Sequence, residues 1–319
     1  MDKFVFISSM ITHKLTGKMS TDYTMAGTSM LTKLESCDWN EQALSYLGLS
    51  SSYFPSLVMA GDLIGTTIPQ VNADLGLESG IPVISTGHDT QFALIGSGAE
   101  KDQAFLSSGT WEILMARSQR PSLDLQALTR GVTVELDSQV GVFNPATQWL
   151  SSAVVEWSAD KFYTVEKLNG DLYSVMIDEA RVAGAGAGGV RFNVDLSAVE
   201  FGEAQGSIDG LSIHTSRGQI MRAVFEGLSR TLKERFDYLN MLCPLQDGPV
   251  VVVGGHKEQA LESTARKCFT TAFTYRGTSG GDCNRSRNVW LCRSWPLSQF
   301  SCCSIENEAR AHSHLSRRS

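Results

Sequence analysis

Residues 80–115, GIPVISTGHDTQFALIGSGAEKDQAFLSSGTWEILM, hold the pattern that most constrains the fold of this chain. Two short apolar runs, at 83–84 and 104–106, each lead into a turn of small residues, and such runs predict strands. The first strand is followed by a predicted helix at 91–99 and the second by a returning strand at 111–115. This order of strands and helices is compatible with an α/β fold, but it does not select one fold among several.

The first turn places His88, Asp89 and Thr90 where the helix begins. A carboxylate in such a place can accept a proton, which makes Asp89 a candidate catalytic residue. The same residues can instead form an Asx turn or a helix N-cap with no catalytic duty. The pattern alone leaves both alternatives open.

The second turn, Ser107-Ser108-Gly109-Thr110, joins the two strands of a predicted hairpin. Backbone N–H groups and hydroxyls in a turn of this kind suit phosphate oxygens. Tight hairpins also use such residues for conformational reasons alone, so this alternative stays open as well.

Several patterns outside this stretch predict structure. Residues 2–15 predict a helix with Phe4, Ile7, Ile11 and Leu15 on one face, ended by Gly17.

Farther along the chain, residues 131–142 predict a hairpin, and Asn144 then precedes a predicted helix at 148–162. On the residues alone, Asn144 is interpreted as a helix cap or part of an Asn-Pro turn. Residues 219–239 predict a long amphipathic helix, and PVVVVGG at 249–255 predicts a buried strand. The glycines that end this strand, Gly254 and Gly255, would let a flat ligand approach the backbone.

Gly184, Gly186 and Gly189 satisfy the spacing G-x-G-x-x-G. A dinucleotide site needs a strand before these glycines, whereas the preceding residues have a helical pattern. We therefore interpret this segment as a loop.

Charge and composition argue for a water-soluble enzyme rather than a nucleic-acid or membrane protein. The 319 residues include 42% hydrophobic residues, enough to build two domains with cores. The formal net charge of -7 argues against a general nucleic-acid binder, whose surface would be basic. No apolar run approaches the roughly 20 residues of a membrane helix, and the N-terminus does not have the pattern of a signal peptide. The cytoplasm is the expected location.

The last 64 residues, 256–319, differ in kind from the rest. They carry 10 Lys and Arg against five Asp and Glu, so the first 255 residues hold a net charge of -12. They also hold five of the seven cysteines and only six Leu, Ile or Val, which is too little aliphatic material for a core. A shifted reading frame, a disordered basic tail and a zinc site are the alternatives, and the cysteine spacings match no C-x-x-C pairing.

Several motifs together resemble the FGGY family of carbohydrate kinases. They are GHDTQFAL, GSGAE and LSSGTWEILM in the central stretch, MDKFVFISSMITHKLTGKMSTDYTMAGTS upstream, and ELDSQVGVFNPATQWLSSAVVEW and RAVFEGLSRTLKERF downstream. The resemblance covers about residues 1–255. It implies a ribonuclease-H-like, actin-type α/β fold with two domains around a cleft. Its boundaries predict the later part of an N-terminal domain at 1–98, a C-terminal domain at 99–255 and an unrelated tail at 256–319.

The same resemblance implies an activity, the transfer of a phosphoryl group from ATP with Mg²⁺ to a ketose. The flanking residues favour L-fuculose, giving L-fuculose 1-phosphate, over rhamnulose or xylulose. Asp89 would be the general base, with His88, Thr90 and Asn144 at the sugar.

Four glycine and threonine positions would serve ATP in this scheme: Gly109 and Thr110 at the phosphates, and Gly254 and Gly255 at adenosine. The expected partners are therefore a small sugar and ATP, with no nucleic acid and no membrane.

The sequence departs from the family at both ends. The Asp-x-Gly-x-Thr phosphate loop with which these kinases open does not occur in the chain, and the resemblance stops after Gly255. We therefore expect an incomplete fold, with no measurable turnover by this chain alone. A non-catalytic remnant, which binds a sugar weakly or not at all, is the alternative from a different functional class.

Overall fold

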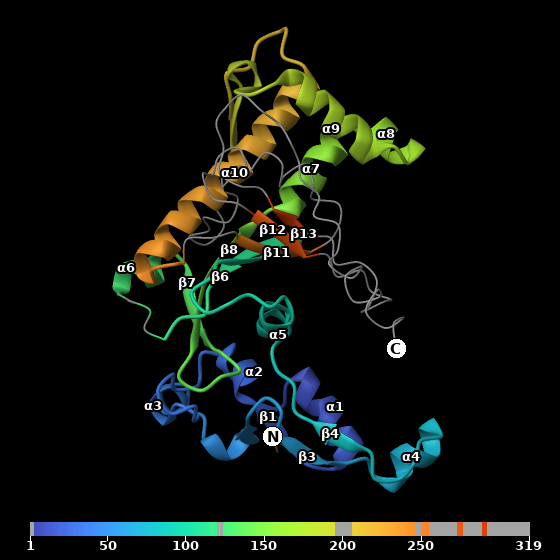
Figure 1. The fold of residues 1–319 in the computed structure, drawn as a ribbon, viewed down its shortest axis with the longest axis vertical. Coiled ribbons are helices and arrows are strands. Elements are labelled where there is room, and N and C mark those ends of the chain that lie inside the picture. Colours follow the sequence, from blue (N-terminus) through green and yellow to red (C-terminus); the bar gives the residue numbers. More distant parts are fainter. Residues whose placement is uncertain are drawn as a thin grey trace, which may run out of the picture. The chain divides into compact units, whose positions relative to one another are not determined.

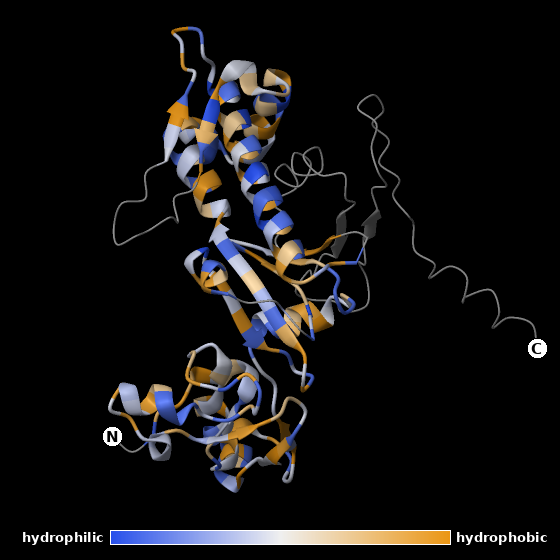
Figure 2. Cartoon of the chain, turned by 90° about the vertical axis from the view of Figure 1, so that its left-hand side faces the viewer, coloured by the Kyte–Doolittle hydropathy of each residue, from blue (hydrophilic) through white to orange (hydrophobic). Residues whose placement is uncertain are grey.

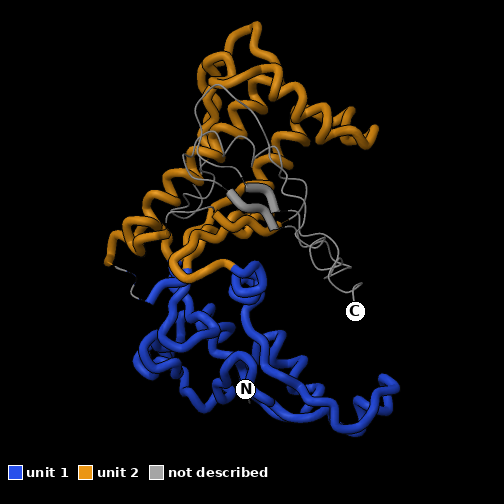
Figure 3. Tube along the Cα trace, viewed as in Figure 1, with its two compact units in different colours: residues 1–98, 117–122, 133–145 blue, residues 99–116, 123–132, 146–319 orange. Residues whose placement is uncertain are grey.

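The computed structural model describes residues 3–119, 121, 124–194, 206–246 and 250–254, together with the backbone of 273–276 and 289–291. The chain divides into two compact units (Figure 3). Unit 1 consists of Met1–Gly98, Arg117–Ser122 and Thr133–Pro145, and unit 2 consists of Ala99–Ala116, Leu123–Val132 and Ala146–Ser319. Unit 1 is thus assembled from segments that are separate in the sequence.

Unit 1 combines short helices with two small sheets (Figure 1). Strand β1 pairs with β2 in parallel, and β3 pairs with β4 antiparallel. Its elements up to Gly98 are α1 (Ile7–Thr16), β1 (Ser20–Asp22), α2 (Tyr23–Gly27), α3 (Glu41–Tyr46), η1 (Ser51–Tyr53), β2 (Ser56–Val58), β3 (Leu63–Thr66), α4 (Pro69–Leu75), β4 (Pro82–Ile84) and α5 (Asp89–Gly96).

Helix α1 corrects one prediction from the sequence. It begins at Ile7, five residues later than predicted, and it ends as predicted at Gly17, whose φ of 73° is left-handed. The predicted apolar face is not the buried one, because Ile7 is 76% and Ile11 51% exposed. The helix buries its small polar side instead, where Ser9 and Thr21 share a hydrogen bond of 2.7 Å between their hydroxyls.

Unit 2 is built on a sheet with the strand order β13-β12-β11-β5-β6-β8-β7. Strand β5 is parallel to β11 and antiparallel to β6, and β6 is antiparallel to β8. The chain passes between the two units within β7 and β8. The elements that follow Ala99 are β5 (Phe105–Ser108), β6 (Trp111–Met115), α6 (Leu125–Thr129), β7 (Val132–Leu136), β8 (Phe143–Leu150), α7 (Ser152–Phe162), α8 (Thr164–Asn169), α9 (Leu172–Ala183), η2 (Ala187–Gly189), β9 (Arg191–Asn193), β10 (Ser207–Asp209), α10 (Arg217–Leu242), β11 (Val250–Gly254), β12 (Phe273–Arg276) and β13 (Val289–Leu291).

The long helix α10 covers this sheet and confirms its predicted amphipathic character. Leu232 and Leu239 pack in one buried cluster with Leu106 of β5 and with Val250 and Val252 of β11. A capping box fixes the start of the helix, because Ser216 and Gln219 each bond the other's backbone N–H. Apolar and polar residues both occur along its length, as Figure 2 shows. The predicted buried strand at the end of the matched region is confirmed by β11, in which all four valines are buried.

The predictions for the glycine-rich segment and for Asn144 differ in outcome, since the first is confirmed and the second is wrong about the local structure. The glycine-rich segment is a loop as predicted, since it follows helix α9 and continues into the short helix η2. Asn144 was predicted to lie ahead of a helix, but it lies inside strand β8 and is fully buried. The helix α7 begins only at Ser152, because residues 143–150 first form strand β8, which pairs with β6.

The tail after Gly255 is described only as the backbone of β12, parallel to β11, and of β13, antiparallel to β12. The other residues of 256–319 lie outside the described part of the chain. They include the residues of the zinc alternative, which are Cys283, Cys292, Cys302, Cys303, His312 and His314. The domain boundaries at 98 and 255 and the unrelated tail stay predictions.

Gly254 supplies a test of how β5 and β11 pack. Its φ is 149°, and a Cβ built on it would lie 2.0 Å from the carbonyl oxygen of Ser108. We expect Gly254→Ala to lower the free energy of unfolding by about 2–4 kcal/mol, because it adds overpacking to backbone strain. The control Gly96→Ala, in a helix with nothing within 4 Å of the new Cβ, should be neutral or stabilising. Denaturant unfolding of the two variants measures the difference, and equal stabilities would contradict the packing described.

Candidate active site

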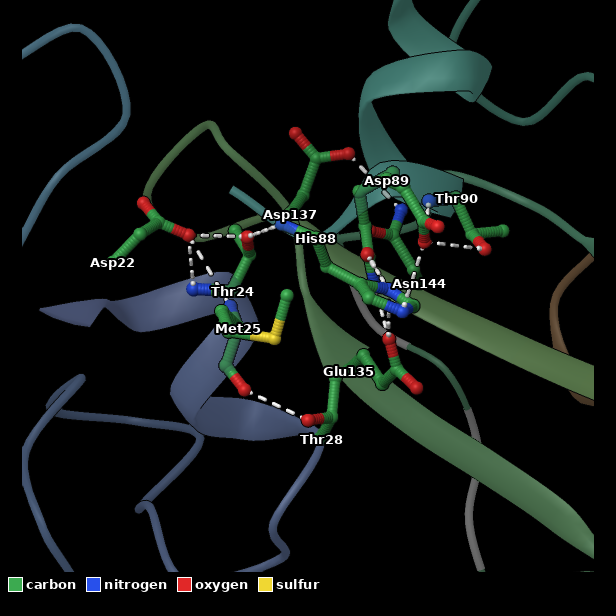
Figure 4. A network of polar contacts seen from close by, with 11 residues as sticks. Asp22, Thr24, Met25, Thr28, His88, Asp89, Thr90, Glu135, Asp137 and Asn144 are labelled. Carbon is green, nitrogen blue, oxygen red and sulfur yellow. Dashed lines mark hydrogen bonds and ion pairs between the residues drawn. The ribbon is translucent and has the colours of Figure 1, made fainter. Parts of the chain in front are cut away.

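The carboxylate of Asp89 stands at the start of helix α5 and is 94% exposed (Figure 4). Its Oδ1 accepts a hydrogen bond of 2.7 Å from the N–H of Thr90, and the Nε2 of His88 lies 3.2 Å from the same oxygen. Within the described chain, Oδ2 makes no hydrogen bond. One oxygen is thus held by its neighbours while the other is open to a ligand.

His88 is held from its other side by residues of α5 and β7. Its Nδ1 contacts the side-chain oxygen of Gln91 and lies 3.4 Å from Oε2 of Glu135, and Gln91 donates to the same Glu135 oxygen. Burial alone lowers the pKa of the imidazole, but the hydrogen bonds and charges of Glu135, Gln91 and Asp89 outweigh burial and raise the pKa above 6.5. Protonated His88 would donate from both ring nitrogens, toward Glu135 and toward Asp89.

The residues before α5 are fixed by the end of strand β1. Thr24 accepts a hydrogen bond of 2.9 Å from the N–H of His88, and its hydroxyl donates to Asp22. Gly87 lies so close to both that a Cβ on it would be 2.4 Å from the Thr24 hydroxyl and 2.6 Å from Asp22 Oδ1. Only glycine therefore fits ahead of His88.

Asp22 is itself a buried acid with an unpaired oxygen. Burial raises the pKa of its carboxyl, although hydrogen bonds from Thr24 and Met25 act in the other direction. Its Oδ2 is buried without a hydrogen-bond partner among the described residues. Asp22 also lines a cavity of about 190 Å³, together with Ser20 and Gly87.

The hairpin β7–β8 is anchored by Asp137, which is completely buried. Arg117 binds both of its oxygens, with Nε at 2.7 Å and Nη2 at 2.8 Å, and the side-chain amide of Asn144 donates at 3.0 Å. Burial alone raises the pKa of this carboxyl, but these contacts and the N–H of Gln139 lower the pKa below its usual value. Tyr23 of α2 donates its hydroxyl to the backbone oxygen of Asp137.

The second candidate site, the turn between β5 and β6, lies in unit 2. The N–H of Gly109 donates to the carbonyl of Trp111, and the Gly109 carbonyl accepts from the side chain of Ser152. Thr110 is exposed, and its carbonyl accepts from the N–H of Ser151. Gly254 of β11 lies opposite Ser108 in the parallel pairing. The start of α7 and the end of β11 thus both pack against this turn.

The structure distributes the predicted site residues over both units. His88, Asp89 and Thr90 lie together at the start of α5, and Gly109 and Thr110 form the β5–β6 turn with Gly254 beside it. Asn144 donates its side-chain amide to Asp137, while its Oδ1 is buried, and its predicted contact with the sugar stays a prediction. Gly255 lies outside the described residues.

Sequence reasoning missed the residues that hold the first site in place, which are Gln91, Thr24, Arg117, Glu135 and Asp137. One sequence signal could have indicated some of these residues, namely the two acids, Glu135 and Asp137, in a segment with the alternating pattern of a strand. Val132, Val134 and Leu136 take one face, which puts Glu135 and Asp137 on the other, where an acid needs a partner. The sequence around residues 132–137 does not predict that the partners of these acids are His88 and Arg117.

The described residues contain no group of three or more His, Cys, Asp or Glu that could hold a metal. No helix in the part of the chain that is described is long and apolar enough to cross a membrane.

Two family descriptions match this chain. Residues 1–96 match the N-terminal domain and residues 104–261 the C-terminal domain of the FGGY family of carbohydrate kinases. The L-fuculokinase of Escherichia coli (strain K12) is 43% identical over 258 residues, which cover 81% of this chain and 53% of that protein. The L-fuculokinase of Haemophilus influenzae is 41% identical over 267 residues, covering 83% and 56%. The chain spans about half the length of the curated relatives it matches.

More distant proteins share the architecture. A rhamnulokinase of Bacteroides thetaiotaomicron is 28% identical over 263 residues, which cover 80% of this chain and 52% of that protein. The solved xylulose kinase of Rhodospirillum rubrum superposes with a TM-score of 0.76 at 16% identity, covering 87% of this chain and 56% of that one. This likeness confirms the predicted sugar-kinase fold of the actin-like class.

The ion pair of Arg117 and Asp137 gives one prediction. Arg117→Ala leaves a buried carboxylate uncompensated and should lower the free energy of unfolding by about 3–5 kcal/mol. Adding Asp137→Asn removes the buried charge, so the double variant should recover part of this loss. In the control Arg181→Ala, which removes an exposed partner of Asp178, the change should stay within about 0.5 kcal/mol. Urea unfolding measures all three, and a loss for Arg117→Ala no larger than the control's would refute the anchoring role of the pair.

His88 gives a second prediction, on pH. Because its pKa is raised on folding, it contributes stability that is complete below the unfolded pKa of about 6.5 and is lost as pH rises through the folded pKa. We expect His88→Gln to reduce the difference in unfolding free energy between about pH 6 and about pH 8. The control His214→Gln removes an exposed imidazole with no described ion pair and should leave this difference unchanged. An unchanged difference in the His88 variant would contradict the contacts assigned to it.

Proposed function

Because this chain belongs to the FGGY family of carbohydrate kinases, we propose that its first unit binds L-fuculose and supplies the catalytic base for phosphorylation by ATP. The product is L-fuculose 1-phosphate. The observation that carries this proposal is the exposed carboxylate of Asp89, one oxygen of which is held while the other is open. The 41–43% identity to L-fuculokinases supports the choice of sugar.

In the proposed reaction, Asp89 Oδ2 takes the proton from the attacking sugar hydroxyl. The hydroxyl oxygen forms a bond to the γ-phosphorus of ATP, and the bond between that phosphorus and its bridging oxygen to the β-phosphate breaks, releasing ADP. His88 fixes the base by binding its Oδ1, and Thr90 binds the same oxygen through its N–H. Thr90 is half-buried, and its hydroxyl, which donates to Asp89 Oδ1 at 3.4 Å, can also accept a hydrogen bond from the sugar.

In this proposal, unit 2 binds the phosphates of ATP. Thr110 offers an exposed N–H and hydroxyl in a turn that the contacts of Ser151 and Ser152 hold in place. Gly109 and Gly254 keep side chains away from this turn, and Gly255 extends the same segment. When bound, Mg²⁺ would neutralise charge on the phosphates, held through their oxygens rather than by a cage of protein ligands.

Phosphorylation of a different ketose is the second candidate function. A rhamnulokinase is 28% identical over a similar length, well below the L-fuculokinases. Titration calorimetry of this chain with L-fuculose, L-rhamnulose and xylulose separates these possibilities, and the tightest binding is expected for L-fuculose. Tighter binding of another ketose would transfer the proposal to that sugar.

The role of Asp89 is tested in the full-length L-fuculokinase of Escherichia coli, at the carboxylate that matches it. Replacing that Asp by Asn keeps the shape and removes the base, so kcat should fall by about a hundredfold or more. Because the side chain is exposed here, the melting temperature should stay near that of the unaltered enzyme. Asp74→Asn in this chain, at an exposed acid in α4 with a described bond to Gln70, is the control for the melting temperature. A near-normal rate of ADP release with L-fuculose would remove Asp89 from the role.

A further inference from the structure

Unit 2 contains an open cavity of about 510 Å³ along the second half of α10. This volume lies within the range of pockets that bind small molecules. Charged side chains dominate its wall, contributed by α10, by β9 and β10 and by the end of α6. They are Arg130, Arg191, Arg230, Arg235, Asp209 and Glu234. None of the candidate site residues lines this cavity.

The arginines of the cavity differ from the other described arginines in one respect. Arg117, Arg181, Arg217 and Arg222 each form an ion pair with a carboxylate. Among the arginine side chains that the structure describes, the remaining four form none, and all four line this cavity. Arginines that form no ion pair are therefore concentrated in one place.

Neutral contacts hold three of these side chains. The guanidinium of Arg130 lies 4.5 Å from the ring centre of Tyr238. Arg235 donates from Nη1 to the Arg130 carbonyl at 2.9 Å, and Arg230 donates from Nη2 to the Phe192 carbonyl at 3.4 Å. A guanidinium has five N–H donors, so these contacts fix the side chains and leave most donors available.

The charge balance of the wall favours an anion. Four arginines against two acids give the lining a net charge of +2, in a chain whose net charge is -7. A concave surface focuses such a field and attracts ions of opposite sign. Arginine binds phosphate oxygens in a bidentate manner, which makes phosphate the favoured anion. Asp209 and Glu234 accept hydrogen bonds, and hydroxyl groups of a ligand can supply them.

We propose that this cavity is a second ligand site, which binds a small phosphate ester bearing hydroxyl groups. Phosphorylated sugars and nucleotides both have this chemistry. None of its lining residues belongs to the β5–β6 turn, so a ligand site here goes beyond the proposed function.

The test measures protection of arginines from phenylglyoxal, followed by mass spectrometry of the full chain. The probes are glucose 1-phosphate, a hexose bisphosphate, ADP and inorganic phosphate. We expect at least one ester to protect Arg191 and Arg230, with inorganic phosphate weaker. Exposed Arg181, on helix α9, is the internal control and should react equally with and without probe. The ester that protects best identifies the source as a sugar or a nucleotide.

Calorimetry of the Arg191→Gln and Arg230→Gln variants with that ester gives an independent readout. Each loses a charge-assisted contact, so binding should weaken by about tenfold or more. Arg181→Gln should bind as the unaltered chain does. Failure of every ester to protect Arg191 and Arg230 beyond Arg181, or affinities that neither variant changes, would overturn the proposal.

Discussion

The buried carboxylate of Asp137 is the contact on which unit 1 depends. It and its backbone carbonyl join Tyr23, Arg117 and Asn144, which come from the separate chain segments that make up the unit. A buried charge is costly unless it is paired and hydrogen-bonded, and here both oxygens are satisfied. Glu135 lies two residues earlier, in strand β7, which ends just before Asp137. The anchor that holds the hairpin therefore also positions the acid that binds His88.

The environment divides the acids of unit 1 into different roles. Asp137 is buried but paired, and its pKa is lowered, which keeps it charged. Asp22 is buried and only partly satisfied, and its pKa is raised. Asp89 is exposed and is restrained through one oxygen by His88 and Thr90. A reactive carboxylate has to be both accessible and held in position, and among these three only Asp89 meets both conditions.

The sequence predicts what is local. The strand, turn and helix order of 80–115, the long amphipathic helix and the valine strand all follow from short-range periodicity, and the structure has them. The helix at the N-terminus was placed with the wrong buried face, because periodicity records apolar residues but does not say which face meets a neighbour. Asn144 was assigned to a turn because Asn-Pro is common there, whereas pairing with distant strands decides its conformation.

The support of the candidate site could not be predicted in the same way. His88 and Glu135 lie 47 positions apart, and Arg117 and Asp137 lie 20 apart. Contacts at such separations follow from topology, which single-sequence patterns do not define. The family resemblance proposes Asp89 as the base, and the structure adds how its carboxylate is held.

The most direct test of this account is a crystal structure of the chain with L-fuculose bound. The account predicts a sugar hydroxyl within about 2.6–3.2 Å of Oδ2 of Asp89, with His88 still on Oδ1 and Glu135 still on His88. A sugar bound without contact to any of residues 88–90 would contradict it.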